Sequence, residues 1–451
     1  MKFEVLKRSH LKRNIIIGIV VVAIISAVVL NFTRAKYRVT ESIPIVNGTI
    51  NYTLPDLNIT ALYIDGVAAD SLESNTNYTL DTERSNCTYK DGSTISNLTL
   101  NYDSETQTFT IIPYTTKGTK CNLYFNEVKI LLKDAILSEK DIQTREDFST
   151  VLSTNTNGII YQETTSDGTT YYFAGDTDEN WVSFAGFYWR IIRINEDGSI
   201  RMIYSGDSES GPAETGVDTQ ISTASFSSTG DNRYDNAYVG YMYTLNNVHG
   251  TGTESGIKKV VDEWYEANIL DTEYEDLLST EAGFCGDRTS NIISNEAPND
   301  TGGSGTTTTY YGARYRLFIN RTPTFECNDE ENDLYTVDAS SKGNHALTYP
   351  VGLISADEVT YAGSVWSNNT YNSEFYLYTN QVYWTLSPDR YQGDTSLTSY
   401  GASNFTVSMD GRIYTAWVNN TYGVRPVINL SSNVTIISGD STSSNPYIIA
   451  T

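Results

Sequence analysis

An uncharged apolar run near the N-terminus constrains this chain more than any other feature. Residues 15 to 32 read IIIGIVVVAIISAVVLNF and contain no charged side chain. As a helix they would span ~27 Å, close to the thickness of the hydrocarbon core of a bilayer. Five basic residues precede the run and three follow it within six positions, so the positive-inside rule predicts that the remainder of the chain lies outside the cell.

A cleaved signal peptide is the alternative interpretation of this segment. Its apolar region is usually shorter and is followed by a small-x-small cleavage site, whereas this chain has Thr33-Arg34-Ala35 after the run. The sequence therefore predicts a cytoplasmic stub and an uncleaved, single-pass membrane anchor over residues 1–38, with the large C-terminal part of the chain extracellular.

The charge of the chain excludes one class of partner. The net charge is −25 over 451 residues, and residues 1–38 contribute +7, so the remainder carries −32. A surface this acidic repels phosphate backbones, and nucleic acid is not an expected partner. The 34 tyrosines favour a β-rich protein, because aromatic residues are enriched in strands.

The four cysteines indicate an oxidising compartment. Cys87 and Cys121 fall in one β-rich region, while Cys285 and Cys327 fall in another, which predicts one disulfide within each region. The sequence has no Cys-x-x-Cys, and its three histidines are scattered, so no zinc site is predicted. Calcium is the one cofactor left open, because the acidic stretch Ser294–Asp300 offers oxygen ligands.

Hydrophobic periodicity divides the extracellular part into three segments. Residues 39–126 alternate over short runs and predict a small β-sandwich. Residues 127–157 place apolar side chains from Val128 to Ile136 at helical spacing, which predicts a helical connector. Residues 158–451 form the second domain, with Asp-Gly turns at Asp197 and Asp410 that predict two hairpins.

Two helices are expected in this second domain. The segment SGIKKVVDEWYEANIL, residues 255 to 270, has an amphipathic pattern. The segment SADEVTYAG begins at Ser355 and has Glu358 three positions later, the spacing of a capping box.

Three C-terminal segments carry a resemblance to a known family. YWTLSP at Tyr383, VSMDGRIYT at Val407 and YGVRPVINL at Tyr422 resemble uncharacterised C-terminal modules of Gram-positive bacterial surface proteins. The resemblance covers roughly residues 158–432. The order of these parts is similar to the C-type-lectin-like fold shared with formylglycine-generating enzymes, which implies two helices, a twisted antiparallel sheet and long variable loops.

The expected fold class is therefore a β-rich multidomain protein with a transmembrane helix, a small β-sandwich and an α+β C-type-lectin-like domain. The enzymes with this fold use a reactive cysteine pair in the substrate groove. Cys285 and Cys327 do not match that arrangement, so the resemblance does not imply the chemistry of these enzymes. No catalytic residue is predicted.

The segment between Trp384 and Phe405 has the Tyr-, Ser-, Gly- and Asn-rich composition of binding loops, although an ordinary surface loop on a Tyr-rich protein would have the same composition. Trp417 is expected in the core. The ligand-binding candidates are Tyr391, Tyr400, Tyr414, Asp389, Arg390 and Asp394.

Arg425 lies among apolar residues of the closing strand. A guanidinium there is costly unless it is hydrogen-bonded or paired. We expect a structural role, with a carboxylate such as Asp287 or with backbone carbonyls as partners.

These features predict a membrane-anchored cell-surface binding or adhesion protein whose ligand is a surface glycan or protein. Two alternatives remain open from the sequence. One is an extracellular enzyme acting on glycans or wall polymers, since paired carboxylates for glycoside hydrolysis cannot be recognised from sequence spacing. The other is a structural surface component.

Overall fold

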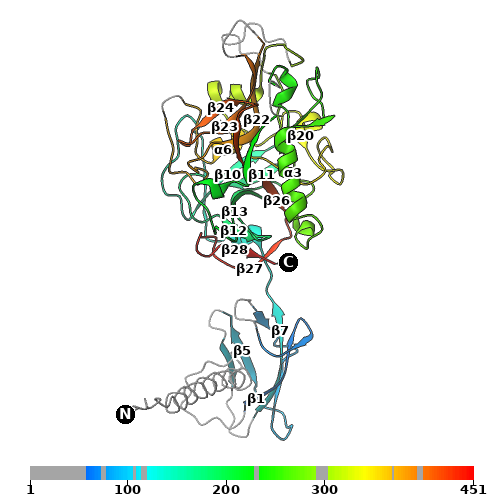
Figure 1. Cartoon of the computed structure of the whole chain (residues 1–451). Helices are drawn as coiled ribbons and strands as arrows, with labels where there is room; N and C mark the ends of the chain where they lie inside the picture. The colour runs from blue at the N-terminus through cyan, green and yellow to red at the C-terminus, as the bar shows by residue number, and fades with distance from the viewer. Residues whose placement is uncertain are drawn as a thin grey trace, which may run out of the picture. The chain divides into compact units, whose positions relative to one another are not determined.

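The fold was analysed in a computed structural model. It describes residues 57–72, 78–104, 108–112, 119–227, 233–290, 303–367, 370–393 and 400–450. The chain divides into two compact units, one ending at Lys129 and the other beginning at Ile130. Each unit is described by itself (Figure 1).

The first unit is built from short strands around β7. The strand order of its larger sheet is β2-β1-β7-β3, with β4 also paired to β7, and β5 and β6 form a separate hairpin. Alternate residues of β7, from Cys121 to Phe125, are buried, as expected for a strand with one face on a core. The strands are β1 (Leu57–Ile64), β2 (Val67–Ala69), β3 (Tyr78–Leu80), β4 (Asn86–Tyr89), β5 (Thr99–Asp103), β6 (Thr108–Ile112) and β7 (Thr119–Glu127).

A disulfide between Cys87 and Cys121 fastens β4 to β7. The two cysteines are directly opposite each other in the antiparallel register, and both are buried. The predicted pairing within the first region is confirmed.

The second unit contains a large sheet in the order β21-β26-β14-β13-β12-β28-β27-β8, extended through β11, β10 and β9. Its centre is the hairpin of β13 and β14, whose turn includes Gly198 at φ 83°, a conformation that glycine adopts without strain. The strands are β8 (Ile130–Leu131), β9 (Asp141–Thr144), β10 (Ile159–Thr165), β11 (Gly168–Tyr172), β12 (Trp181–Phe184), β13 (Phe187–Ile194), β14 (Ile200–Asp207), β21 (Val351–Gly352), β26 (Val427–Leu430), β27 (Thr435–Ser438) and β28 (Tyr447–Ile449).

A second sheet of this unit has the order β15-β25-β22-β23-β24, with β19 paired to β22. The hairpin of β23 and β24 turns at Asp410 and Gly411. Its strands are β15 (Ser222–Ser225), β19 (Thr309–Tyr310), β22 (Tyr383–Gln392), β23 (Gly401–Val407), β24 (Ile413–Trp417) and β25 (Thr421–Val424). Two further strand pairs are β16 (Met242–Tyr243) with β17 (Thr253–Glu254) and β18 (Phe284–Cys285) with β20 (Leu334–Tyr335).

The helices of the second unit are short apart from α3 (Gly256–Asn268), which lies along one side of the unit in Figure 1. Ser255 caps α3 by accepting from the backbone N–H of Lys258, and Ile257, Val261 and Tyr265 are buried on its inner face. The others are α2 (Leu132–Leu137), α4 (Gly312–Arg314), α5 (Glu330–Asp333), α6 (Ala356–Tyr361), the 3-10 turns η1 (Val217–Thr219), η2 (Asn236–Val239) and η3 (Glu275–Leu277), and the π-helical turn η4 (Tyr315–Asn320).

The predicted fold class is wrong. The regular structure of the described residues is mainly strand, arranged in several sheets, and α3 is their only helix longer than eight residues, so the second unit is β-rich and not the expected α+β domain. The second expected helix, a short one, is present as α6, which is six residues long and ends just before Gly363 at φ 124°. No helix in the described part of the chain is long and apolar enough to cross a membrane, and the predicted span Ile15–Phe32 lies outside the described residues.

The structure also differs from the helical connector predicted over residues 127–157. Only α2 is helical there, while β8 pairs with β27 and β9 pairs with β10. Leu132 and Ile136 are buried, but Val128, which the helical pattern placed on the same face, is exposed. Glu139 at φ 59° follows the helix, so the local apolar periodicity extends over less than two turns.

Candidate functional site

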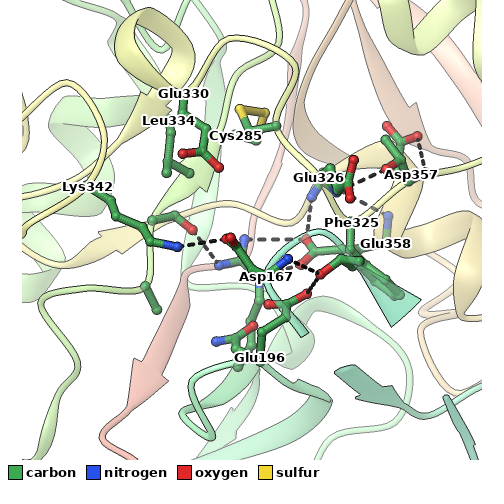
Figure 2. Close-up of a pocket in the computed structure, with 18 of the residues that line it drawn as sticks. Asp167, Glu196, Cys285, Phe325, Glu326, Glu330, Leu334, Lys342, Asp357 and Glu358 are labelled. Carbon is green, nitrogen blue, oxygen red and sulfur yellow. Dashed lines mark hydrogen bonds and ion pairs between the residues drawn. A yellow bond between two sulfur atoms is a disulfide. The ribbon is translucent and has the colours of Figure 1, made fainter. Parts of the chain in front are cut away.

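A cavity of about 450 Å³ lies in the second unit and is the candidate site (Figure 2). Its wall comes from segments that are far apart in the sequence: the β10–β11 turn, the β13–β14 hairpin, several segments between residues 281 and 358, and Ser387. Its charged lining residues are Asp167, Arg193, Glu196, Asp197, Arg201, Glu281, Asp287, Arg316, Glu326, Glu330, Lys342, Asp357 and Glu358.

One buried ion cluster of the wall is centred on Glu358. Its carboxylate pairs with Arg201 at 2.5 Å and with Arg193 at 3.3 Å. It also accepts from the backbone N–H of Ser355, and the Ser355 hydroxyl accepts from the Glu358 N–H, so the predicted capping box is confirmed. Burial raises the pKa of Glu358, but Arg201, Arg193 and the Ser355 N–H outweigh burial and hold this pKa below its ordinary value.

A second buried ion cluster is centred on Arg316. Its guanidinium donates to Asp357 through Nε and Nη2, each at 2.9 Å, and to Asp287 through Nη1 at 2.6 Å. Burial lowers the pKa of Arg316, but Asp357 and Asp287 outweigh burial and raise it. Asp287 adopts a left-handed φ of 26°, and strained backbone of this kind persists where surrounding contacts hold it.

The outer part of the cavity carries less constrained charges. Lys342 pairs with Asp167 at 2.7 Å, and both side chains are about half exposed. Glu281 accepts from the backbone N–H and the hydroxyl of Ser341. The Glu330 carboxylate has no hydrogen bond or ion pair with any described residue, so it is available to a ligand, while the Glu330 carbonyl accepts from the Leu334 N–H within α5.

The disulfide between Cys285 and Cys327 forms part of the wall. It fastens the segment that carries Asp287 to the segment that carries Glu326 and Glu330. The predicted pairing is confirmed, and disulfides of this kind are consistent with an extracellular protein.

The cavity has an excess of negative charge. Nine acidic and four basic side chains line it, and all four basic side chains pair with acidic lining residues. Concave walls of one sign concentrate the electrostatic field and raise the local concentration of oppositely charged groups. The arrangement therefore favours a ligand with a positively charged, hydrogen-bond-donating group.

None of the five ligand-binding candidates that the structure describes lines this cavity. Tyr391 is only 2% exposed. Asp389 is fully buried, where it accepts from Arg314 Nη1 and from the Ser403 hydroxyl, both at 2.8 Å. Arg390, at 3.7 Å from Asp389, is partly exposed. Tyr391 and Asp389 are therefore interior residues and are not accessible to a ligand at the surface.

Two other candidates, Tyr414 and Tyr400, stack on different aromatic rings. Tyr414 is 42% exposed and stacks on Trp366. Tyr400 stacks on Tyr234 with a centroid distance of 5.2 Å. Trp417, expected in the core, is only partly buried. Asp394 and the possible calcium-binding stretch Ser294–Asp300 lie outside the described residues.

Arg425 is only 1% exposed, and its contacts are with the interior of the protein. Its Nε and Nη2 donate to the Tyr204 carbonyl at 3.1 and 2.9 Å, Nη2 also donates to the Ser205 hydroxyl, and the guanidinium lies over the Tyr383 ring. Of the partners considered from the sequence, the backbone carbonyl is the one observed, while Asp287 pairs with Arg316. Burial lowers the pKa of Arg425, against the opposing effect of Tyr383.

No family model, curated protein or solved structure matches the chain. The geometry and charge of the cavity are therefore the basis for a function.

Proposed function

We propose that the chain is an extracellular binding protein, and that the cavity of its second unit recognises an ammonium group on a surface ligand. An amino sugar and a lysine side chain both carry this group. The resemblance of the three C-terminal segments to modules of bacterial surface proteins supports a role in surface binding, and the two disulfides support an extracellular location.

The observation that carries the proposal is the charge imbalance of the cavity wall. Its four basic side chains have acidic partners, whereas Asp197, Glu281, Glu326 and Glu330 have no ion pair with a described residue. An ammonium group offers three donors and one positive charge, which complements carboxylates that only accept hydrogen bonds.

The buried ion clusters support binding because they hold the wall in place before a ligand arrives. Glu358 and Arg316 are each fixed by two charged partners. A preformed wall avoids part of the entropic cost of ordering side chains on association. The outer carboxylates of Glu326 and Glu330 are then the groups that contact the ligand.

The proposal is tested with ligand pairs that differ in a single charge. Binding of glucosamine and of N-acetylglucosamine to the purified full-length protein is measured by titration calorimetry, and Nα-acetyl-lysine amide is compared with its Nε-acetylated form. We expect the charged member of at least one pair to bind and its acetylated counterpart not to bind. Equal binding of both members, or binding of neither charged probe at millimolar concentration, would contradict the proposal.

Two variants locate the binding site. Replacing Glu326 and Glu330 together by Gln removes two negative charges with little change of shape, and we expect the affinity for the charged probe to fall at least tenfold. Glu273→Gln is the matched control, because Glu273 is an exposed acidic residue away from the cavity lining. An equal loss in the control would mean that the acidic surface as a whole attracts the probe.

A further inference from the structure

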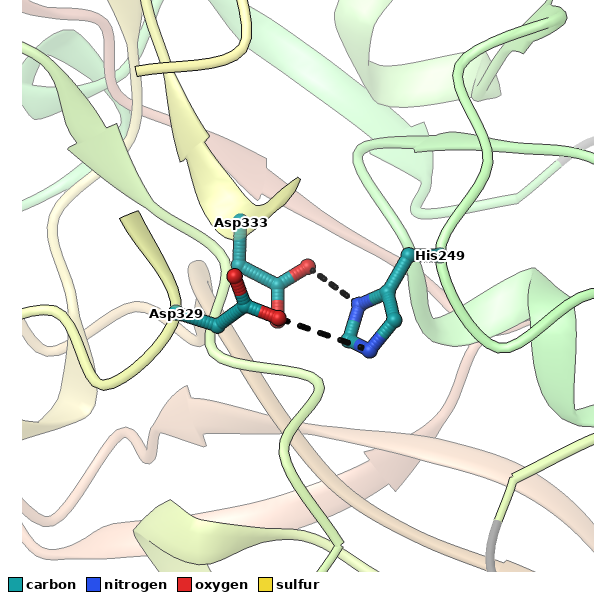
Figure 3. A group of neighbouring side chains, drawn as sticks. All are labelled: His249, Asp329 and Asp333. Carbon is teal, nitrogen blue, oxygen red and sulfur yellow. Dashed lines mark hydrogen bonds and ion pairs between the residues drawn. The ribbon is translucent and has the colours of Figure 1, made fainter. Parts of the chain in front are cut away.

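His249 lies between two carboxylates that do not line the cavity (Figure 3). It belongs to the loop before β17, while Asp329 caps the N-terminus of α5 and Asp333 is the last residue of that helix. One ligand atom from each of the three side chains lies within 4.8 Å of the others.

Asp333 fixes the orientation of the imidazole. Its carboxylate is fully buried and accepts from Arg288 twice, from Nε at 2.8 Å and from the backbone N–H at 2.6 Å. His249 Nδ1 lies 3.1 Å from the same carboxylate. An ionised carboxylate only accepts hydrogen bonds, so this contact favours the tautomer in which Nδ1 carries the proton and Nε2 has the lone pair.

That lone pair faces a second acceptor. His249 Nε2 lies 3.7 Å from Asp329 Oδ2, beyond the usual range of an N–H···O hydrogen bond. Two tetrahedral ligand atoms of one metal ion, each about 2.0–2.2 Å from it, are about 3.3–3.6 Å apart, which is slightly shorter than this distance. The spacing therefore suits an ion between them better than a direct hydrogen bond.

Contacts from outside the cluster orient both ligand atoms. Arg288 holds the carboxylate that positions His249, and Asn332 donates to Asp329 through its backbone N–H and its side-chain amide. A carboxylate that orients a metal-binding histidine is a recurrent feature of metal sites. The side chains of His249 and Asp329 are 25% and 28% exposed, which leaves space for water to complete the coordination.

We propose that His249 Nε2 and Asp329 Oδ2 bind a divalent ion of the zinc class, with Asp333 as the positioning residue for the imidazole. A nitrogen donor selects zinc and its neighbours over calcium and magnesium, which prefer oxygen ligands. The site is independent of the proposed cavity function. This site could not be predicted from the sequence, because His249 and Asp329 are 80 positions apart and lack the close spacing typical of zinc ligands.

The test uses full-length protein that has been stripped with a chelator. Titration calorimetry with Zn²⁺ at neutral pH is expected to show one saturable site, and Co²⁺ is expected to give the visible absorption of a nitrogen- and oxygen-ligated ion. His249→Gln and Asp329→Asn are expected to abolish both signals. Asp333→Asn is expected to weaken zinc binding by about 10- to 100-fold. Ca²⁺ is expected to give no signal.

His345→Gln is the control, because His345 is an exposed histidine outside the cluster whose Nδ1 contacts the Val337 carbonyl. Circular dichroism checks that each variant is folded. If Asp333→Asn unfolds, the His249 and Asp329 variants still test the proposal, because both of these side chains are partly exposed. Zinc binding that survives His249→Gln overturns the proposal, as does a preference for Ca²⁺. A ¹⁵N NMR measurement can also overturn the proposal. If both nitrogens of His249 are protonated and their signals do not change when Zn²⁺ is added, an imidazolium bridges the carboxylates in place of an ion.

Discussion

Arg316 and Asp357 are joined by two parallel hydrogen bonds, Nε to Oδ1 and Nη2 to Oδ2, each of 2.9 Å. This two-point geometry is the strongest form of the arginine–carboxylate contact. The same guanidinium also binds Asp287, so one buried cation holds two segments of the cavity wall.

The first prediction concerns this ion cluster. Asp357→Ala leaves Arg316 with one carboxylate in a buried position, and we expect it to lower the free energy of unfolding of the second unit by about 3–5 kcal/mol. Urea denaturation followed by tryptophan fluorescence measures this change. Lys342→Ala removes the half-exposed pair with Asp167 and should change stability by at most about 1 kcal/mol. If the two substitutions lowered the free energy of unfolding equally, the Arg316 ion cluster would be exposed to water and not buried.

The second prediction concerns acid. The pKa of Glu358 is lower in the folded state than its ordinary value, so its contribution to stability is complete above the pKa of the unfolded chain and is lost as the pH falls through the folded value. The ordinary pKa of a Glu side chain is 4.5. Below that pH, we expect the stability of the second unit to fall more steeply in the wild type than in Glu358→Gln.

Unfolding free energies measured between pH 7 and pH 3 check this prediction. Glu273→Gln is the control, because Glu273 is exposed, and it should keep the wild-type slope. A Glu358→Gln profile parallel to that of the wild type would mean that this carboxylate titrates alike in the folded and unfolded chains.

The third prediction concerns the disulfide in the cavity wall. Cys285 and Cys327 are separated by 42 positions, and closing a loop of this length stabilises a fold by about 2–4 kcal/mol. Replacing both cysteines by Ser should lower the stability of the second unit by that amount and weaken ligand binding in the cavity.

Replacing Cys87 and Cys121 by Ser is the comparison, because these residues lie in the first unit. This second variant should destabilise the first unit and leave the unfolding transition of the second unchanged. A shift of the second unit's transition in the Cys87/Cys121 variant would contradict the independence of the two units.

The sequence predicted those structural features whose signals are local. Both Asp-Gly hairpins, helix α3 and the Ser355–Glu358 capping box depend on residues within a few positions of each other, and all are present in the structure. The cavity could not be predicted in this way. Arg201 and Glu358, for example, meet across 157 positions, and nothing in their spacing indicates a contact.

The same limitation applies to the interior positions of Asp389 and Tyr391. Asp389 and Tyr391 stand among polar residues, which favours exposure in a sequence. Arg314, 75 positions from Asp389, supplies the partner that allows this carboxylate to be buried. The burial of Asp389 therefore depends on a charge partner that is distant in the sequence.

The last prediction concerns Arg425, whose guanidinium binds the Tyr204 carbonyl and the Ser205 hydroxyl without a carboxylate ion pair among the described residues. Arg425→Lys keeps the charge but cannot reproduce the two-point contact with one carbonyl, and should cost about 1.5–3 kcal/mol. Arg425→Ala also leaves a void in the core and should cost more, about 3–5 kcal/mol. Arg425→Met fills most of that void and removes a buried charge, so its cost should be smaller than that of Ala. Chemical denaturation of the three variants gives the order. If Lys were as stable as the wild type, the planar guanidinium would not be the feature that holds β25 and β26 to β14.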